Sequence, residues 1–442
     1  MEEIEINLTL KVKVPQEGLN VNGVLQGLGK GIREMWPQML RCILHAVEER
    51  EIARLQRRGS YVRNGHTSRQ RIIRTEFGAV PYRLQQMQEK TTGRTVVPLR
   101  ESAFLLPYGV GEGEETLEKA VGAAIHLSYR RAASETERMG GGRVSPMGVH
   151  RRLQKLARQR CQLGNLQHIP YRFLMVDGTG YRRQGARGRD LGRGEFRCAL
   201  AATGVGSPFD TVGVWVDTSW ADIRSDLEQR LRYDHLEVLL ADGESGAERL
   251  LAEGMRFQRC VIHGKRDFAA LLYADGITGK AQKPFRERLA ALPVFSLHKK
   301  RLEQVTEEDR PLVEKAAEHT KEGFRALLAL LDEKRYPQSR TYIKNLVDNV
   351  TTFLDWWLHK GEWIDATTNI IEGTFSRIKN RIKNVGRRWS DRGMLNWLLV
   401  AVQKIFYPGL WRTLWEHFDE RNPAIEMKIV HIDWKWLSCP IT

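Results

Sequence analysis

Cysteine is scarce in this sequence, and so are long apolar runs. The cysteines number five in 442 residues, an odd count at wide spacing, which excludes a disulfide framework and indicates a reducing compartment. The longest apolar run is about WLLVAV, residues 397–402, far short of the roughly 20 residues of a membrane span. The first ten residues, MEEIEINLTL, are acidic and alternating, unlike a signal peptide. We therefore expect a cytoplasmic protein without a membrane segment.

Negative charge is also in deficit. Seventy Lys and Arg residues stand against 54 Asp and Glu residues, which gives a net charge of +16 and an isoelectric point near 9.7. An excess of this size is typical of proteins that bind polyanions, and nucleic acid is the first candidate. We therefore expect a nucleoid-associated protein whose partner is double-stranded DNA.

Residues 1–105 predict a small mixed domain with no catalytic pattern. Residues 4–14 alternate apolar and polar side chains with a period of two, which predicts a half-buried strand. Residues 33–58 have helical length and spacing, with an interruption expected at Pro37. Residues 69–84 contain a glycine between two short apolar runs and predict a hairpin.

Residues 106–165 predict a helix-turn-helix region that binds DNA. A helical segment over 117–139 is followed by GGGRV and by a second helix, in which Ser145 can cap and Pro146 suits the first turn. Val149, Leu153 and Leu156 form its apolar stripe. A basic second helix after a glycine turn is typical of such readers, although an amphipathic hairpin with solvated arginines fits the same pattern. The candidate DNA-binding residues are His150, Arg151, Arg152, Lys155 and Arg158.

Residues 166–407 alternate strands and helices in an order that favours a mixed sheet of the ribonuclease H-like fold. Asp177 follows FLMV and Asp242 follows VLLA, so each aspartate comes at the end of a buried strand. Asp-Gly after a strand is also a common turn. If the two strands are neighbours, however, two carboxylates meet at one edge of the sheet, where a divalent cation such as Mg²⁺ would relieve their repulsion.

Glu372 is the single acidic residue in the cationic segment TTNIIEGTFSRIKNRIKNVG, after an all-helical insertion at about 275–362. We expect it to complete the metal site with the two aspartates. A capping box with Asn369 as N-cap is the alternative. The helix should bury Ile371, Phe375, Ile378, Ile382 and Val385 and should place Ser376, Lys379 and Lys383 on the face of Glu372. The candidate DNA-backbone contacts here are Arg377, Lys379, Lys383, Arg387 and Arg388.

The segments MVDGT, LLADGE, QRCVIHGKRDF and TTNIIEGTFSRIKNRIKNVGRRWS resemble, in this order, the catalytic signatures of Mutator-type DDE transposases of prokaryotic insertion sequences. The resemblance covers about residues 110–407. It implies a ribonuclease H-like domain in which Asp177, Asp242 and Glu372 hold two Mg²⁺ ions, with Mn²⁺ able to substitute. It also implies that Cys260 and His263 form a Cys-x-x-His motif, with His263 beside the triad and Cys260 auxiliary to it.

Cys260 and His263 have other interpretations. A zinc site needs about four ligands, and no second pair stands at finger spacing. A nucleophilic dyad is disfavoured if the strand continues, because residues three apart then point to opposite faces. A buried cysteine with a histidine in the next turn is the structural alternative. Likewise, Trp356, Trp357 and Trp363 could stack on DNA bases or pack in the core.

The expected activity is cleavage of element ends at terminal inverted repeats, followed by attack of the freed 3′-hydroxyls on target DNA. Because two ends must be held together, a dimer or larger assembly is expected. The alternatives are a structure-selective nuclease of the same fold, such as a Holliday-junction resolvase, a catalytically silent DNA-binding regulator, and a scaffolding protein. Residues 408–442 form a C-terminal tail without a predicted role.

Overall fold

The computed structural model describes residue 6 and residues 20–75, 78–101, 114–139, 144–161, 163–297, 305–385 and 388–421. The chain divides into two compact units. Unit 1 comprises Met1–Ala123, Tyr129–Val149 and Phe406–Thr442, and unit 2 comprises Ala124–Ser128 and His150–Ile405. The strand expected over residues 4–14 lies, apart from Ile6, outside the described residues. The division into four predicted domains remains a prediction.

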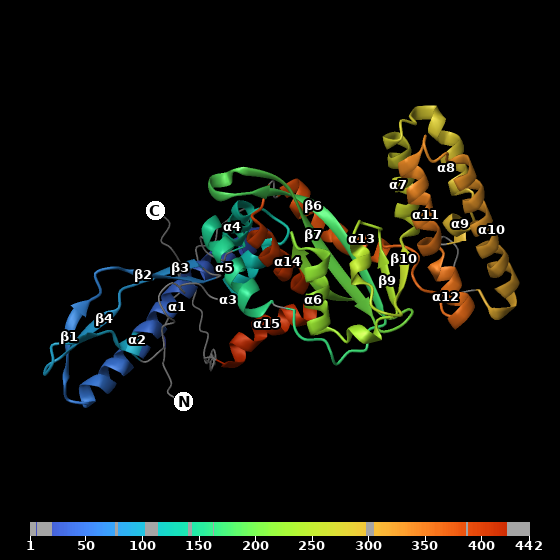
Figure 1. Cartoon of the computed structure of the whole chain (residues 1–442). Coiled ribbons are helices and arrows are strands. Elements are labelled where there is room, and N and C mark those ends of the chain that lie inside the picture. The colour runs from blue at the N-terminus through green and yellow to red at the C-terminus, as the bar shows by residue number, and fades with distance from the viewer. Residues whose placement is uncertain are drawn as a thin grey trace. The chain divides into compact units, whose positions relative to one another are not determined.

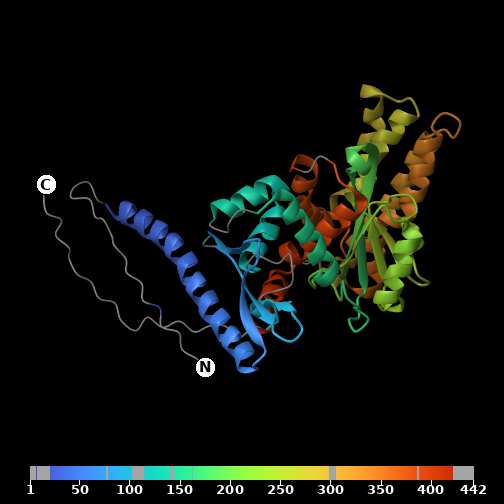
Figure 2. The same ribbon diagram turned by 90° about the vertical axis from the view of Figure 1, so that its left-hand side faces the viewer.

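Unit 1 begins with one long helix, α1 (Val21–Arg57), which Figure 2 shows as an unbroken rod. Its start is set by Asn20, whose side chain accepts a 3.0 Å hydrogen bond from the Gly23 amide. The predicted interruption at Pro37 is wrong, because the helix runs through this residue. Proline removes only one backbone donor, and the turns on either side keep their hydrogen bonds.

Two small sheets accompany α1. The hairpin predicted over 69–84 is confirmed as β2 (Arg71–Thr75) paired antiparallel with β3 (Gly78–Tyr82). The other sheet has the order β1-β4-β5, formed by Tyr61–His66, Gln85–Glu89 and Thr95–Val96. A short core of Ile52, Leu55, Met87 and Val96 joins it to the second half of α1.

The remaining helices of unit 1 depart from the sequence prediction at one point. The helix expected over 117–139 is two helices, because the Ala124 carbonyl accepts hydrogen bonds from the side chains of Trp397 (3.3 Å) and Arg381 (3.5 Å). These side chains take an acceptor that a continuing helix would need. The helices are α2 (Pro98–Glu101), α3 (Glu114–Ala124), α4 (Tyr129–Arg138) and α15 (Pro408–Arg421), with α5 (Pro146–Arg160) at the boundary of the units.

Unit 2 is built on a five-stranded mixed sheet of order β10-β9-β6-β7-β8, visible in green in Figure 1. Strands β6, β7 and β8 pair antiparallel, whereas β9 and β10 run parallel to β6. The predicted series of strands is therefore confirmed as a mixed α/β arrangement. Between β9 and β10 the described chain forms a 3₁₀ turn, Ala247–Leu250. The strands are β6 (Phe173–Gln184), β7 (Asp190–Ala202), β8 (Asp210–Val216), β9 (Val238–Ala241) and β10 (Arg256–Arg259).

Different elements pack against the two faces of this sheet. Leu174, Val176 and Leu239 pack against α6 (Trp220–Arg230) on one face. On the other face, Phe173 and Val238 join the core of the helical region. Side chains of a strand alternate between faces, so Asp177 lies on the same face as Phe173.

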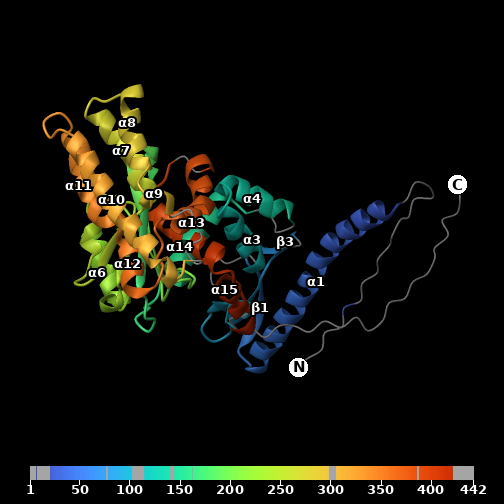
Figure 3. The same cartoon turned by 90° about the vertical axis from the view of Figure 1, so that its right-hand side faces the viewer.

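The helical region is all-helical in its described residues, as predicted, and it starts earlier than predicted, at Val261. Figure 3 shows α7, α8, α10 and α11 side by side. The helices are α7 (Val261–Ala274), α8 (Lys283–Ala290), α9 (Val294–Leu297), α10 (Arg310–Leu330), α11 (Pro337–Val350) and α12 (Thr352–Lys360).

The tryptophans of this region belong to its core. Trp356 is 4% exposed and Trp357 is 2% exposed, and the Trp357 ring stacks on that of Trp363 at 5.1 Å. Base stacking by Trp356 and Trp357 is therefore wrong, because no face of either ring is open to a nucleotide.

Two further helices complete unit 2, α13 (Asn369–Asn380) and α14 (Asp391–Phe406). A π-helical turn, Arg381–Val385, continues α13. In the described part of the chain, no helix combines the length and the apolar character needed to cross a membrane.

Candidate active site

Asp177 and Asp242 lie on neighbouring strands at one edge of the sheet. The parallel register of β6 and β9 pairs Val176 with Ala241, so the next residue on each strand is an aspartate. Asp177 is 5% exposed, and Asp242 is partly exposed. The structure therefore brings these two predicted residues together.

One detail of the prediction is wrong. Asp177 lies in the first half of β6, not near its end, because β7 continues to pair with β6 as far as Gln184 and Asp190. Only the parallel partner β9 stops at this level. Asp177 is consequently held on one side by the antiparallel ladder, opposite Cys198. Burial, with the nearby Asp177 charge, raises the pKa of the Cys198 thiol, so the thiol stays protonated.

A turn after β9 holds the carboxylate of Asp242. The Glu244 amide donates a 2.9 Å hydrogen bond to Asp242 Oδ1. Gly243 between them has φ +90°, and a Cβ there would lie 2.3 Å from the Arg259 guanidinium, so only glycine fits. The turn thus fixes the direction in which Asp242 leaves the sheet.

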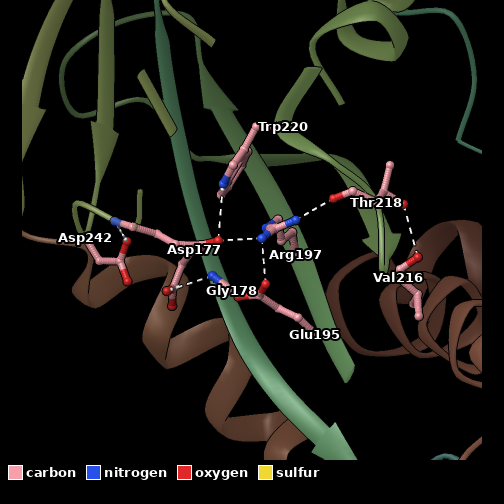
Figure 4. A network of polar contacts seen from close by, with 9 residues as sticks. Asp177, Gly178, Glu195, Arg197, Val216, Thr218, Trp220 and Asp242 are labelled. Carbon is pink, nitrogen blue, oxygen red and sulfur yellow. Dashed lines mark hydrogen bonds and ion pairs between the residues drawn. The ribbon is translucent and has the colours of Figure 1, made fainter. Parts of the chain in front are cut away.

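The side chain of Glu244 is anchored on the face of the sheet opposite to Asp177. Asp177 pairs with Cys198, so the next residue, Arg197, points to the other face, and it is Arg197 that binds Glu244. Figure 4 shows Arg197 there between Trp220 and Glu195. It accepts hydrogen bonds from Arg197 and from Trp220 Nε1, the latter at 3.2 Å. The Arg197 guanidinium lies 4.5 Å from the Trp220 ring centroid and pairs with Glu195 at 2.6 Å. Burial raises the pKa of the Glu195 carboxyl, and the Glu244 charge adds to this effect, whereas Arg197 opposes it.

Gly178 makes room for this network. A Cβ at this position would lie 2.8 Å from Glu195 Oε1 and 3.3 Å from Glu244 Oε2. The sequence prediction missed Glu195, Arg197 and Glu244 as site residues. The only available signal was the position of Glu244 two residues after Asp242.

Glu372 lies in the first turn of α13, and a chain of hydrogen bonds that passes the end of β10 connects it to the sheet. The Cys260 amide donates to the Ala241 carbonyl at 2.8 Å, and the Thr368 amide donates to Cys260 Sγ at 3.3 Å. Thr368 is the N-cap of α13, and its hydroxyl lies 3.5 Å from Glu372 Oε1. These contacts link Glu372 to the same sheet edge as the two aspartates.

His263 contacts the same carboxylate oxygen. Its Nε2 lies 3.5 Å from Glu372 Oε1. Thr368 and His263 both contact Oε1 of the Glu372 carboxylate, and Oε2 has no partner among the residues that the structure describes. The alternative, a capping box with Asn369 as N-cap, is wrong, because Thr368 takes the N-cap position and Glu372 is one residue too far along to close the box.

Cys260 and His263 form a contact that the sequence prediction disfavoured. Strand β10 ends at Arg259, so Cys260 is the N-cap of α7 and His263 lies in its first turn, with Nδ1 3.3 Å from Sγ. Burial raises the pKa of Cys260, but hydrogen bonds from His263 and Thr368 outweigh it and lower the pKa overall. The hydrogen bond to Cys260 raises the pKa of His263 against burial, with a contribution from Asp242. Cys260 is fully buried, so it has no access to a substrate.

The predicted cationic face of α13 is only partly described. Ile371, Phe375, Ile378 and Ile382 are buried as expected, and Phe375 packs edge-on against Phe196 at 5.3 Å. The π-helical turn widens the spiral after Asn380, so the ideal helical spacing used to place Lys383 does not hold. Arg377 and Lys383 are exposed, and Arg388 pairs with Asp190 at 3.0 Å. The side chains of Lys379 and Val385, and all of Arg387, lie outside the described part.

Some of the basic residues of α5 line a pocket and others do not. Ser145 caps the helix as predicted, since its Oγ accepts from the Gly148 amide at 3.0 Å, and Val149, Leu153 and Leu156 are buried. His150, Arg151 and Arg158 line an open pocket with the start of α14. Arg152 and Lys155 do not line it.

The chemistry of the donors suits a hard divalent cation. Asp177, Asp242 and Glu372 offer only oxygen atoms, which Mg²⁺ and Mn²⁺ prefer. Across residues 20–421, leaving aside the stretches that are not described, no three His, Cys, Asp or Glu side chains gather closely enough to enclose a metal ion. The three carboxylates share one edge of the sheet without converging on one point.

Comparison with known proteins gives little. No protein-family model matches the sequence, and no curated protein matches it. Among solved structures, the Drosophila P element transposase strand transfer complex matches with a TM-score of 0.25 and 14% identity, over 72% of this chain and 86% of that chain. Neither a shared fold nor a shared activity follows from so loose a superposition.

Proposed function

We propose that this chain is a DDE transposase of the Mutator type, in which Asp177, Asp242 and Glu372 form the catalytic triad. The observation that supports the proposal most strongly is the register of β6 on β9, which sets Asp177 beside Asp242. Two unrelated aspartates in turns have no reason to occupy the same level of neighbouring parallel strands. Thr368 and Cys260 link Glu372 to this edge from a helix far along the sequence.

The topology of the sheet supports a ribonuclease H-like catalytic domain. Three antiparallel strands are followed by two strands that run parallel to the first, in the spatial order β8-β7-β6-β9-β10. This is the order expected of that fold. The helical region between β10 and α13 corresponds to the all-helical insertion that the resemblance implies.

The chain's own groups have distinct tasks in the proposed reaction. Asp177 is fixed by the β6–β7 ladder, Asp242 by the Glu244 amide, and Glu372 by His263 and Thr368, which leaves Glu372 Oε2 available. Bound to these oxygens, Mg²⁺ or Mn²⁺ would act as a Lewis acid on the scissile phosphate and lower the pKa of the attacking water or 3′-hydroxyl. Arg377 and Lys383 are exposed on the same segment as Glu372, and in the proposed reaction they would bind the DNA backbone.

The partners in this proposal are the terminal inverted repeats of the element and a target DNA. Joining two ends requires a dimer or a larger assembly on DNA. The net charge of +16 suits binding to a polyanion.

A plasmid assay tests the proposal. The donor is a supercoiled plasmid that carries the coding sequence with its native flanking DNA, and a second plasmid serves as target. With Mg²⁺, the protein should cut at the borders of the element and produce covalent donor–target joints. Asp177→Asn and Asp242→Asn should bind the same DNA and give neither product. Cleavage of branched DNA without joining would instead indicate a structure-selective nuclease, and binding without cleavage would indicate a silent regulator.

A further inference from the structure

An open pocket of about 340 Å³ lies between α5 and the beginning of α14, away from the triad. His150, Arg151, Gln154 and Arg158 come from one side of α5, since they are spaced at one and four residues. The residues from the other wall are Ser390, Arg392 and Gly393. All of these residues belong to unit 2.

The pocket concentrates positive charge that no acidic group balances. Arg151, Arg158 and Arg392 are exposed, and none of them has an acidic partner among the described residues. The Nε of Arg158 donates a 3.1 Å hydrogen bond to the Gln154 carbonyl. His150 adds no charge at neutral pH, because burial, and then the Arg151 charge, lower its pKa. Three guanidinium groups around one opening favour a ligand with several anionic oxygens.

A buried donor also faces this opening. Gln154 is 7% exposed, and its Oε1 accepts a hydrogen bond from the Asn396 side chain. Its Nε2 has no hydrogen-bond partner in the described part of the protein. An unpaired buried amide is costly, and an acceptor oxygen entering the pocket would satisfy it.

The start of α14 adds a favourable electrostatic environment. Ser390 caps the helix, accepting from the Gly393 amide at 3.2 Å, so the positive end of a 16-residue helix lies at the pocket wall. Asp391 in the same turn does not line the pocket, and its carboxylate is bound by Arg183 at 2.6 Å and by the Tyr181 hydroxyl at 2.5 Å. Its charge is therefore balanced elsewhere.

We propose that this pocket binds a single phosphate of the DNA backbone, held by Arg151, Arg392 and the Gln154 amide. The inference rests on the proposed function for its partner, DNA. This proposal changes the role predicted for α5, which was that of a DNA-reading helix. The side of α5 that carries these residues packs beside α14, so it cannot also lie against base edges in the major groove. The pocket thus positions the duplex without reading its sequence.

Ethylation interference on the full-length protein tests the pocket. Arg151→Ala combined with Arg392→Ala is compared with Arg286→Ala combined with Arg288→Ala, two exposed arginines of α8 that do not line the pocket, so the control removes the same charge elsewhere. The probe is a duplex from the native flank of the coding sequence. Ethylation of one phosphate should weaken binding by the wild type and by the control pair. It should have no further effect on the pocket pair, whose affinity should already be about tenfold lower.

Salt dependence gives a second readout. The slope of log K against log salt should fall in magnitude by about 0.9 in the pocket pair, as expected for one lost phosphate contact. Melting temperatures should be unchanged, because both arginines are exposed. An interference pattern like that of the wild type, or a changed base preference in the pocket pair, would overturn the proposal. Ethylation interference requires DNA binding but not cleavage. If the pocket pair loses the phosphate contact and the wild type does not cleave, the proposed activity is contradicted and the pocket is not. If the wild type cleaves and the pocket pair keeps the wild-type interference pattern, the pocket is contradicted and the activity is not.

Discussion

His263 Nε2 lies 3.5 Å from Glu372 Oε1, and the Thr368 hydroxyl lies 3.5 Å from the same oxygen. Thr368 also contacts His263 Nδ1 at 3.4 Å, and its amide donates to Cys260. The end of β10, the start of α7 and the start of α13 are thereby joined at one buried point. The consequence is a fixed Oε1 and an available Oε2 on Glu372.

Thr368→Val should lower the rate of end cleavage, because it removes the hydroxyl and keeps the shape of this fully buried side chain. Partners that orient a ligand of a metal contribute about 10–100-fold to activity, and we expect a loss in that range with unchanged DNA affinity. Thr368→Ser keeps the hydroxyl and should recover most of the rate. If serine and valine are equally impaired, the side chain acts only through packing. The measurement is single-turnover cleavage at saturating protein.

Glu372→Gln should fold and bind end DNA normally and should cut nothing. Glutamine keeps the length and hydrogen bonding of the side chain but not the charge that a metal ligand needs. A purely structural role of Glu372 in the first turn of α13 predicts nearly full cleavage for this variant, since glutamine can accept the same hydrogen bond from Thr368. Cleavage products on a sequencing gel, with binding measured in parallel, separate the two roles.

Glu244→Ala should reduce cleavage about 10–100-fold without weakening DNA binding, because the turn that holds Asp242 loses its anchor on Arg197 and Trp220. Glu248→Ala is the matched control, since it removes the same charge from the same loop, where Glu248 accepts a 3.2 Å hydrogen bond from the Gly246 amide. Equal cleavage rates for the two variants would show that the anchor does not position Asp242.

Gly178→Ala should destabilise the fold by about 1–3 kcal/mol, because the new methyl group overlaps Glu195 and crowds Glu244. Gly180→Ala is the control on the same strand and the same face, where the nearest atom to the new Cβ is the Gly194 carbonyl oxygen at an ordinary 3.7 Å. Its unfolding free energy should change by less than about 0.5 kcal/mol from this contact. Urea denaturation monitored by tryptophan fluorescence measures both, and equal losses would contradict the steric account.

The sequence predicts the core of the site better than its surroundings. Asp177 and Asp242 follow apolar runs that only buried strands explain, so their meeting at one sheet edge was foreseeable. The extent of β6 was not, because it depends on pairing with β7 as far as Asp190, and pairing is a tertiary property. Arg197 and Glu244 were missed for the same reason, since they are far apart in sequence and are brought together by the sheet.

In the helix that carries Glu372, the sequence predicts which residues are buried but misplaces the N-cap by one residue. Its apolar spacing correctly predicts that Ile371 and Phe375 are buried. The cap position shifts by one residue, to Thr368, because the Thr368 amide binds Cys260, a partner that no local pattern reveals. The π-helical turn after Asn380 likewise changes the number of residues per turn, so the helical spacing that was used to place Lys383 on the face of Glu372 does not apply.

The most direct test of the central claim is the metal dependence of Asp242→Cys. If Asp242 is a metal ligand, the thiolate should fail with Mg²⁺, a hard cation that prefers oxygen, and cleavage should return with Mn²⁺, which accepts softer ligands. The wild type should cleave with either ion. The same assay on Asp242→Asn should show no cleavage with either ion. Asp242→Cys activity that is equal in Mg²⁺ and Mn²⁺, or absent from both, would contradict direct coordination by Asp242.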